Sequence, residues 1–426
     1  MEIHIVTQGE TIYSIANEYG TSPQRLIVDN GLTGLNNLVI GQSLIILRPS
    51  VTHTVTQGES IYSIAALYEI DPIRLILNNP TLIFNTNIIP GEILTIAFDN
   101  QTNGNIETYG YIYPFINRDL LQLQAAYCTR MAVFSYGFTQ SGELIPINDN
   151  SVLSSLERWQ TQPIMLLSSI TEEGTFQNEK ATVLFNNIEV QNNVIANMLG
   201  VMREKGYIGV DLDFEYIDPA DRDAYVAFVE NVTTVMNQNG YSVNVDLAPK
   251  NSDNQRGTLY EGHDYAALGS AANTVLLMTY EWGYTYGPPM AVAPINKVRE
   301  VVEYGVSKID NTKIYMGIPN YGYDWLLPYV QGNSKARSIG NEEAIRIAQR
   351  YGAVINFDEV AASPYFNYLD ESGREHEVWF EDVRSIIAKY DLIDEFQLLG
   401  GGYWNLMRSF IQNWSYVNSQ YRIAKV

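Results

Sequence analysis

The chain has 426 residues and a formal net charge of −22 at pH 7, from 26 Lys and Arg against 48 Asp and Glu. Nucleic acids and anionic membranes attract Lys and Arg, so this charge argues against either as a partner. Hydrophobic residues make up 46% of the chain and aromatic residues 12%, which is enough for a large core and excludes an intrinsically disordered protein.

Membrane insertion, secretion and metal binding also find little support. No stretch approaches the 18 apolar residues of a membrane span, and the N-terminus lacks the basic and apolar segments of a secretory signal. Cys128 is the only cysteine, which rules out an intramolecular disulfide, and the four His are scattered. We therefore expect no zinc cluster, no other metal and no cofactor.

The first hundred residues contain one pattern twice. The segment HIVTQGETIYSIA at 4–16 returns as HTVTQGESIYSIA at 53–65, an offset of 49. Gly41 and Gly91 are 50 apart, so the second copy has one extra residue in the preceding loop. Each copy predicts a strand, a Gly turn, two helices and a closing strand, with Thr11 and Ser60 as natural helix N-caps.

This repeat resembles the lysin motif (LysM), a βααβ module, with one copy at 1–48 and the other at 51–98. The resemblance implies binding to glycans that contain N-acetylglucosamine, in a groove between the first strand–helix turn and the helix–strand loop. Two weak modules on one chain would raise retention on a repeating polymer. By position the expected glycan-binding residues are Gly9, Glu10, Thr11, Ile12 and Asn30, and in the second copy Gly58, Glu59, Ser60, Ile61 and Asn79.

A polar, turn-rich stretch at 99–105 is the expected linker, and residues 106–426 form the expected second domain. In that domain eight strand-like segments alternate with helical patterns, which predicts a closed (β/α)₈ TIM barrel in the α/β class. The long connection after the seventh strand predicts a small α+β insertion at about 328–380. The eight segments are 108–113, 131–136, 164–168, 209–215, 242–248, 274–279, 314–318 and 400–404.

The stretch IGVDLDFEY at 208–216 alternates apolar and acidic residues. In a strand this places Asp211, Asp213 and Glu215 on one face. Clustered carboxylates oppose each other's ionisation, and Asp213 and Glu215, roughly 7 Å apart, could share a proton. A Mg²⁺ or Ca²⁺ site and a purely structural acidic rim are the alternatives, but no phosphate-binding loop accompanies these residues.

The same stretch resembles the DGxDxDxE signature of glycoside hydrolase family 18, and supporting motifs follow in order at 278–280, 317–322 and 403–404. The family implies a substrate-assisted retaining mechanism, in which the 2-acetamido group of the sugar acts as the nucleophile. Carried over, Glu215 is the acid and base, Asp213 orients the acetamido group, Asp211 supports Asp213, and Tyr280 binds the acetamido oxygen. The expected substrate-binding residues are Trp404, Tyr136, Tyr323, Asp324 and Trp282.

Two positions depart from the family pattern. Ile208 replaces the first Asp of the signature and is expected to pack against a helix, and Glu281 stands where the family usually has Asp. The acid, its partner Asp213 and the tyrosine are intact, so catalysis is still expected.

Two lysin motifs joined to this barrel resemble the spore cortex-lytic N-acetylglucosaminidases of endospore-forming bacteria. That resemblance implies a monomer, made without a signal peptide and located at the spore coat and cortex, that cleaves peptidoglycan between N-acetylglucosamine and a muramic-acid-derived sugar during germination. A chitinase and a catalytically silent glycan-binding coat protein are the alternatives, although the lectin reading requires a loss of the acid that has not occurred here.

Overall fold

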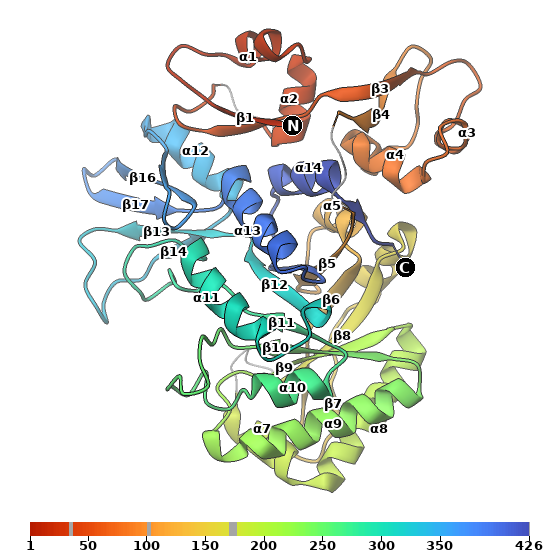
Figure 1. Cartoon of the computed structure of the whole chain (residues 1–426), viewed down its shortest axis with the longest axis vertical. Helices are drawn as coiled ribbons and strands as arrows, with labels where there is room; N and C mark the ends of the chain where they lie inside the picture. Colours follow the sequence, from red (N-terminus) through yellow and green to blue (C-terminus); the bar gives the residue numbers. More distant parts are fainter. Residues whose placement is uncertain (34–36, 100–103, 170–176, 426) are drawn as a thin grey trace.

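The structure is a computed structural model that describes residues 1–33, 37–99, 104–169 and 177–425. Two small N-terminal modules lie side by side on one flank of a large barrel domain (Figure 1). No helix in these described ranges is both long and apolar enough to cross a membrane.

Both N-terminal modules have the expected βααβ order. The first consists of β1 (Glu2–Ile5), α1 (Ile12–Tyr19), α2 (Pro23–Asn30) and β2 (Ser43–Ile46). The second consists of β3 (Pro49–Thr54), α3 (Ile61–Leu67), α4 (Pro72–Asn78), the short 3₁₀ helix η1 (Pro80–Ile83) and β4 (Ile93–Phe98). In each module the two strands pair antiparallel. Thr11 and Ser60 cap their helices as predicted, each accepting a hydrogen bond from a backbone N–H in the first turn.

The predicted barrel is confirmed, with all eight strands near their expected positions. They pair in parallel in the order β5, β18, β12, β11, β10, β9, β8, β6, and pairing of β6 with β5 closes the barrel. The first strand begins at Asn105, inside the expected linker, and linker residues 100–103 lie outside the described residues. The strands are β5 (Asn105–Ile112), β6 (Arg130–Phe138), β8 (Gln162–Ser168), β9 (Gly209–Asp213), β10 (Ser242–Leu247), β11 (Thr274–Leu277), β12 (Ile314–Pro319) and β18 (Gly400–Trp404).

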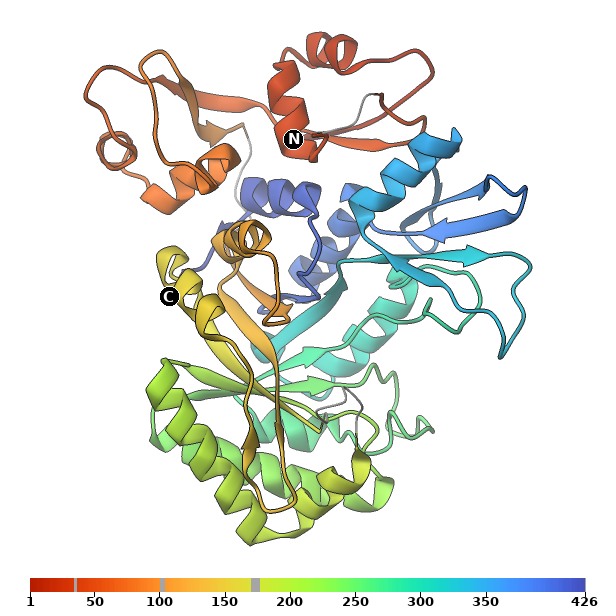
Figure 2. The ribbon, with the colours of Figure 1, turned by 180° about the vertical axis from the view of Figure 1, so that it is seen from behind.

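Helices on the outside of the barrel cover these strands (Figure 2). Their apolar faces pack on the outward side chains of the strands in one continuous core that also takes in the second N-terminal module. Short strands β7 (Leu144–Ile145) and β19 (Arg422–Ile423) extend the sheet. The helices are α5 (Arg118–Tyr127), α6 (Asn150–Leu156), η2 (Glu157–Trp159), α7 (Asn178–Asn186), α8 (Ile188–Lys205), η3 (Pro219–Asp221), α9 (Arg222–Gln238), α10 (Tyr265–Ala271), α11 (Ile295–Val306), η4 (Asn311–Lys313), α13 (Val383–Glu395) and α14 (Ile411–Gln420).

The insertion between β12 and β18 is an α+β unit, as expected, but it begins earlier than position 328. Its five-stranded antiparallel sheet already includes β13 (Gly322–Leu326). The remaining strands are β14 (Arg337–Ile339), β15 (Asn356–Asp358), β16 (Ser363–Leu369) and β17 (Glu375–Trp379), and α12 (Asn341–Tyr351) packs on the sheet. Residues 370–374 form the hairpin turn that joins β16 to β17.

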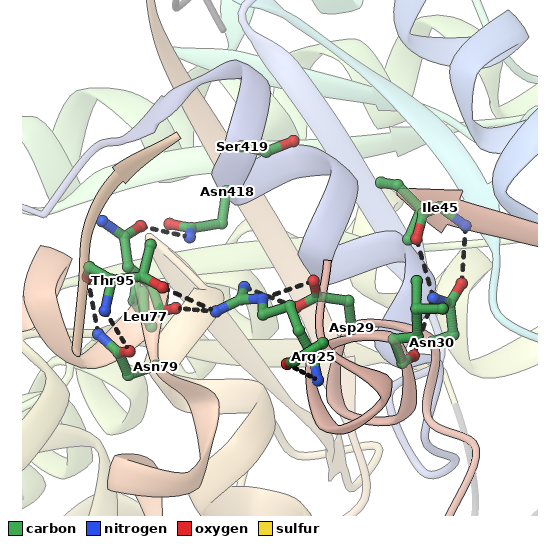
Figure 3. A network of polar contacts seen from close by, with 12 residues as sticks. Arg25, Asp29, Asn30, Ile45, Leu77, Asn79, Thr95, Asn418 and Ser419 are labelled. Atoms are coloured by element: carbon green, nitrogen blue, oxygen red, sulfur yellow. Dashed lines mark hydrogen bonds and ion pairs between the residues drawn. The ribbon is translucent and has the colours of Figure 1, made fainter. Parts of the chain in front are cut away.

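A buried polar network joins the two modules to each other and to α14 (Figure 3). Arg25 forms an ion pair with Asp29 at 2.6 Å and donates to the carbonyl oxygen of Asn78 in the second module. Asn418 of α14 donates to the side-chain oxygen of Asn78, and Gln412 of the same helix donates to Asn30. The modules therefore sit on the barrel in a fixed position instead of hanging from a linker.

The Arg25 pair gives a stability prediction. Arg25→Met leaves the carboxylate of Asp29, only 1% exposed, without its cation. Because an unpaired buried charge is costly, we expect a loss of about 3–5 kcal/mol in unfolding free energy, measured by denaturant titration. Arg48→Met is the matched control, since its pair with Glu2 is about half exposed and is worth at most about 1 kcal/mol. An Arg25→Met/Asp29→Leu double variant should recover most of the lost unfolding free energy. Equal losses in Arg25→Met and Arg48→Met would contradict the importance of the buried pair.

Candidate functional site

The cleft lies at the carboxyl ends of the barrel strands, the usual place for a site in this fold. Its volume is about 760 Å³. Carboxylates and aromatic rings dominate its lining, and among the described residues that line it Lys297 is the only Lys or Arg. The carboxylate and aromatic residues of the lining include Tyr113, Phe134, Asp213, Glu215, Tyr216, Asp246, Tyr260, Tyr280, Glu281, Trp282, Tyr284 and Trp404.

Strand β9 supplies Asp211 and Asp213, and Glu215 follows it by two residues. Val210, Leu212 and Phe214 alternate with these acids and pack into the outer core, which fixes the direction of the acidic face. Asp211 is fully buried beneath the cleft and accepts hydrogen bonds from Tyr109 (2.8 Å), Tyr111 (2.9 Å) and Asn244 (2.9 Å). It is therefore held in the barrel interior and does not line the cleft.

Asp246 of β10 is a fourth carboxylate that the sequence interpretation missed. The hydroxyl of Tyr111 lies 2.7 Å from Asp246 and 2.9 Å from Asp211. A phenol has one proton and can donate to only one of these two carboxyl groups. The other contact is a hydrogen bond only if that carboxyl group is protonated and donates to the phenol oxygen. Burial raises the pKa of Asp246 and of Asp211, which favours such a shared proton.

Asp213 is buried, and its Oδ1 has no hydrogen-bond partner among the described residues. Burial and the neighbouring charges of Glu215 and Asp211 hold its pKa well above the usual range. Leaving a buried carboxyl oxygen without a donor costs free energy, and Asp213 lines the cleft. The geometry therefore leaves one acceptor ready for an N–H or O–H group of a ligand.

Glu215 is half-buried, and burial together with the charge of Glu281 raises its pKa to about 7. The sequence interpretation assigned this effect to Asp213; the structure makes burial the largest cause and Glu281 the charged neighbour. Glu281 accepts hydrogen bonds from the hydroxyls of Tyr321 and Tyr323. Tyr216 and Glu281 both have positive φ, 54° and 66°, so backbone strain is concentrated around Glu215.

Trp404 ends β18 and lines the cleft. Three aromatic rings hold it edge to face: Phe134 at 5.3 Å, Tyr111 at 5.8 Å and Tyr113 at 6.2 Å between ring centroids. Phe134 and Tyr113 line the cleft as well, although the sequence interpretation did not select them. Tyr113 directly follows β5, and this position was the available signal for it, whereas Phe134 lies within β6.

Tyr280 and Trp282 line the cleft. The ring of Tyr280 lies so close to Gly317 that a Cβ there would be 2.8 Å from its Cε1. The carbonyl oxygen of Leu277 would be nearer still, at 2.5 Å, and these contacts explain the glycine at position 317.

Three residues that were expected to contact substrate do not line the cleft. Tyr136 is buried on the outer side of the barrel, where its hydroxyl donates to Asp149 and accepts from Lys205. The pairing of β6 with β8 shifts register between Val133 and Tyr136, and this irregularity turns Tyr136 away from the interior. Asp324 points into the insertion and bonds to His376, Tyr368 and Arg337. Tyr323 is buried behind the cleft and reaches it only through Glu281.

Ile208 also differs from expectation. It packs on the cluster of side chains inside the barrel that includes Tyr109 and Tyr111, and not against an outer helix. Strand β9 begins only at Gly209, so the alternation of the strand does not extend to this residue.

In the modules, the expected binding residues of the strand–helix turns are mostly accessible. Gly9, Thr11, Gly58 and Ser60 are exposed, Ile12 is half-buried and Ile61 is buried. Glu10 and Glu59 instead tie their own turns together, each accepting from a histidine and from a backbone N–H.

Asn30 and Asn79 are structural. Each donates to a carbonyl oxygen of its own helix and exchanges two hydrogen bonds with the backbone of the closing strand, Ile45 or Thr95 (Figure 3). Their amides are thereby occupied, which corrects the expectation that they bind glycan.

One group of three metal-type side chains occurs among the described residues: His4, Glu10 and Glu18. Both ring nitrogens of His4 already have partners, the hydroxyl of Tyr19 and the carboxylate of Glu10. The acidic cleft lies on the barrel and is separate from this group.

Comparisons with known proteins agree with this geometry. The LysM domain model matches residues 4–47 and 53–97. The cortical fragment-lytic enzyme of Bacillus subtilis (strain 168) is 39% identical over 100% of this chain and 99% of its own length, and that of Bacillus cereus is 37% identical over the same shares. The crystal structure of the Bacillus megaterium QM B1551 spore cortex-lytic enzyme SleL superposes with a TM-score of 0.84 at 36% identity, covering 100% of this chain and 99% of that one. The model of glycosyl hydrolases family 18 matches residues 102–408, and the chain belongs to this family.

Proposed function

We propose that this glycoside hydrolase cleaves the bond between N-acetylglucosamine and a muramic-acid-derived sugar in spore cortex peptidoglycan or its fragments during germination. The relatives that match over the whole chain are named as cortical fragment-lytic and spore cortex-lytic enzymes, which supports the spore as the place of action. The observation that carries the chemistry is the pairing of Asp213, a buried carboxyl with an unfilled acceptor, with Glu215, a carboxyl whose pKa is about 7.

The proposed reaction begins with an N-acetylglucosamine unit above Trp404. The free Oδ1 of Asp213 accepts the N–H of the 2-acetamido group and directs its carbonyl oxygen toward the anomeric carbon. As that oxygen attacks, Glu215 donates its proton to the glycosidic oxygen, and the muramic-acid-derived sugar leaves. The bond between the anomeric carbon and the leaving oxygen breaks while the oxazolinium ring forms.

The second half restores the sugar. The carboxylate of Glu215 takes a proton from a water molecule, whose oxygen attacks the anomeric carbon and opens the oxazolinium ring. The configuration is retained because two displacements occur at the same carbon. Tyr280 lines the cleft beside the reacting sugar and is proposed to bind the acetamido oxygen, while Asp211 supports Asp213 from below. In this scheme the protein needs no carboxylate nucleophile of its own.

The acid role of Glu215 predicts that Glu215→Gln lowers the turnover of cortex fragments by about 10²–10⁴-fold, because the amide cannot donate a carboxyl proton. Turnover is measured as new reducing ends. Glu303→Gln, an exposed position on α11, is the control and should keep full activity. A Glu215→Gln protein that remains active would refute the assignment, and a wild-type protein that releases no new ends would favour a silent glycan-binding protein.

The proton on Glu215 also predicts a pH dependence. Activity should fall as the pH rises through about 7, because the acid is protonated only below its pKa. Glu281→Gln removes a like charge while keeping an acceptor for Tyr321 and Tyr323, so it should lower the pKa of Glu215 and move this limb to lower pH. The measurement is the pH profile of kcat/KM, with Glu300→Gln, another cleft carboxylate, as the control. An unmoved limb in Glu281→Gln would show that this charge does not act on the acid.

A chitinase is the second candidate, because chitin offers the same acetamido group to Asp213. Mass spectrometry of products from purified cortex fragments and from chitin oligomers separates the two. We expect faster turnover of cortex fragments, with N-acetylglucosamine at the new reducing ends; preferential cleavage of chitin oligomers would reverse the assignment.

A further inference from the structure

The two N-terminal modules repeat one sequence pattern, but their surroundings in the structure differ. Gly41 and Gly91 correspond, so Val39 in the first helix–strand loop corresponds to Ile89 in the second. Val39 is 5% exposed and Ile89 is 66% exposed. Equivalent apolar residues thus have opposite environments.

Val39 is buried in the core of the barrel insertion and not in the core of its own module. It belongs to a cluster with Ile339, Ile347, Phe366 and Val378 of the insertion. In both views of the ribbon the first module lies beside α12, and the second module lies away from the insertion (Figures 1 and 2). The first module therefore contributes a side chain to the hydrophobic core of another domain.

Hydrogen bonds to backbone carbonyl oxygens hold the same loop in place. The side chain of Gln349 donates to the carbonyl oxygen of Asn37 at 2.7 Å, and the N–H of Ile355 donates to that of Ile40 at 3.0 Å. A Cβ on Gly41 would lie 1.9 Å from the carbonyl oxygen of Ile355, whereas one on Gly91 meets no described atom within 4 Å. The helix–strand loop is one wall of the groove that the lysin-motif resemblance assigns to glycan, and in the first module residues 37–41 of that wall are engaged by the insertion.

The insertion also contacts the cleft, which gives a reason for its contacts with the first module. Its strand β13 carries Tyr323, whose hydroxyl donates to Glu281 beside the catalytic acid. The loop at 37–41 of the first module contacts α12 and Ile355 of the insertion. It thereby supports the insertion, which carries Tyr323 and forms a wall behind the cleft.

In the second module the corresponding loop is open. Phe84 is 55% exposed, and Asn85 and Asn87 are exposed beside Ile89. The module docks on the barrel by other residues, Leu82 and Ile83, which are buried. Residues 75–91 carry no charged side chain in a chain of net charge −22, so this surface offers amide and apolar groups that suit an uncharged, acetamido-bearing sugar polymer.

We propose that the two modules have divided their roles: the second module alone holds the glycan polymer, and the first serves as a structural brace for the cleft wall. The polymer class rests on the proposed function. The division itself rests on the contrast between Val39 and Ile89 and between Gly41 and Gly91.

The test measures retention of the full chain on insoluble cortex peptidoglycan, with Glu215→Gln as background so that the polymer is not degraded. Ile89→Asp should weaken retention by about tenfold or more, because it places a charge on an uncharged binding surface. Ile93→Asp is the matched control: Ile93 is equally exposed at 66% but lies on β4, in the groove between the modules. Loss of retention in Ile93→Asp and not in Ile89→Asp would place the polymer between the modules and overturn the proposal.

A second pair compares the modules directly. Gly9 and Gly58 have φ of 88° and 90°, and a Cβ at either meets no described atom within 4 Å. Valine is equally strained at both, so Gly9→Val and Gly58→Val distort equivalent turns. We expect Gly58→Val to lose retention and Gly9→Val to keep it, with thermal unfolding as the check on folding. Equal losses, or a loss confined to Gly9→Val, would refute the division of roles.

The brace is tested in the active protein. Val39→Ala should lower the turnover of soluble fragments by about twofold or more while retention is unchanged, because it loosens the core of the insertion. Unchanged turnover together with lost retention would contradict the brace. Soluble fragments test the proposed hydrolysis independently: if the wild-type chain does not cleave them, the proposed function fails, whatever the retention of the module variants.

Discussion

The site depends on the electrostatic repulsion among four carboxyl groups, which lie in or beside the interior of one barrel. Asp211, Asp213 and Asp246 are buried, and Glu215 stands half-buried next to them. In a low dielectric their mutual repulsion is strong, so the cluster must hold protons that isolated acids would release. The pKa values of all four are raised, each chiefly by burial.

The surroundings give these similar groups different roles. Tyr109, Tyr111 and Asn244 satisfy Asp211 with hydrogen bonds, which makes it an internal support. Asp213 has an oxygen without a partner among the described residues and faces the cleft. Glu215 is more accessible than either, and its pKa near 7 suits a group that gives up and regains a proton. The differences arise from donors and exposure, not from residue type.

The rest of the molecule holds this arrangement in place. Three aromatic rings fix Trp404, and two tyrosines from the β12–β18 connection fix Glu281. The insertion is packed in turn against the first N-terminal module through Val39, and α14 ties both modules to the barrel through Gln412 and Asn418. The modules are thus part of the same packed body as the cleft.

The sequence by itself determined the features that depend on local patterns. Alternating patterns located the eight strands, and the motif around Asp211, Asp213 and Glu215 identified the acidic strand, because side-chain direction within one element follows from its own geometry. Only the tertiary structure brought in Asp246, Phe134 and Tyr113, which meet β9 and Trp404 through barrel closure. An irregularity in β6 turns Tyr136 outward. Asn30 and Asn79 form hydrogen bonds with the backbone of the closing strand of their modules. Val39 and Ile89 illustrate the reason: corresponding apolar residues of two repeated modules acquire different environments because burial depends on which distant segments pack against them.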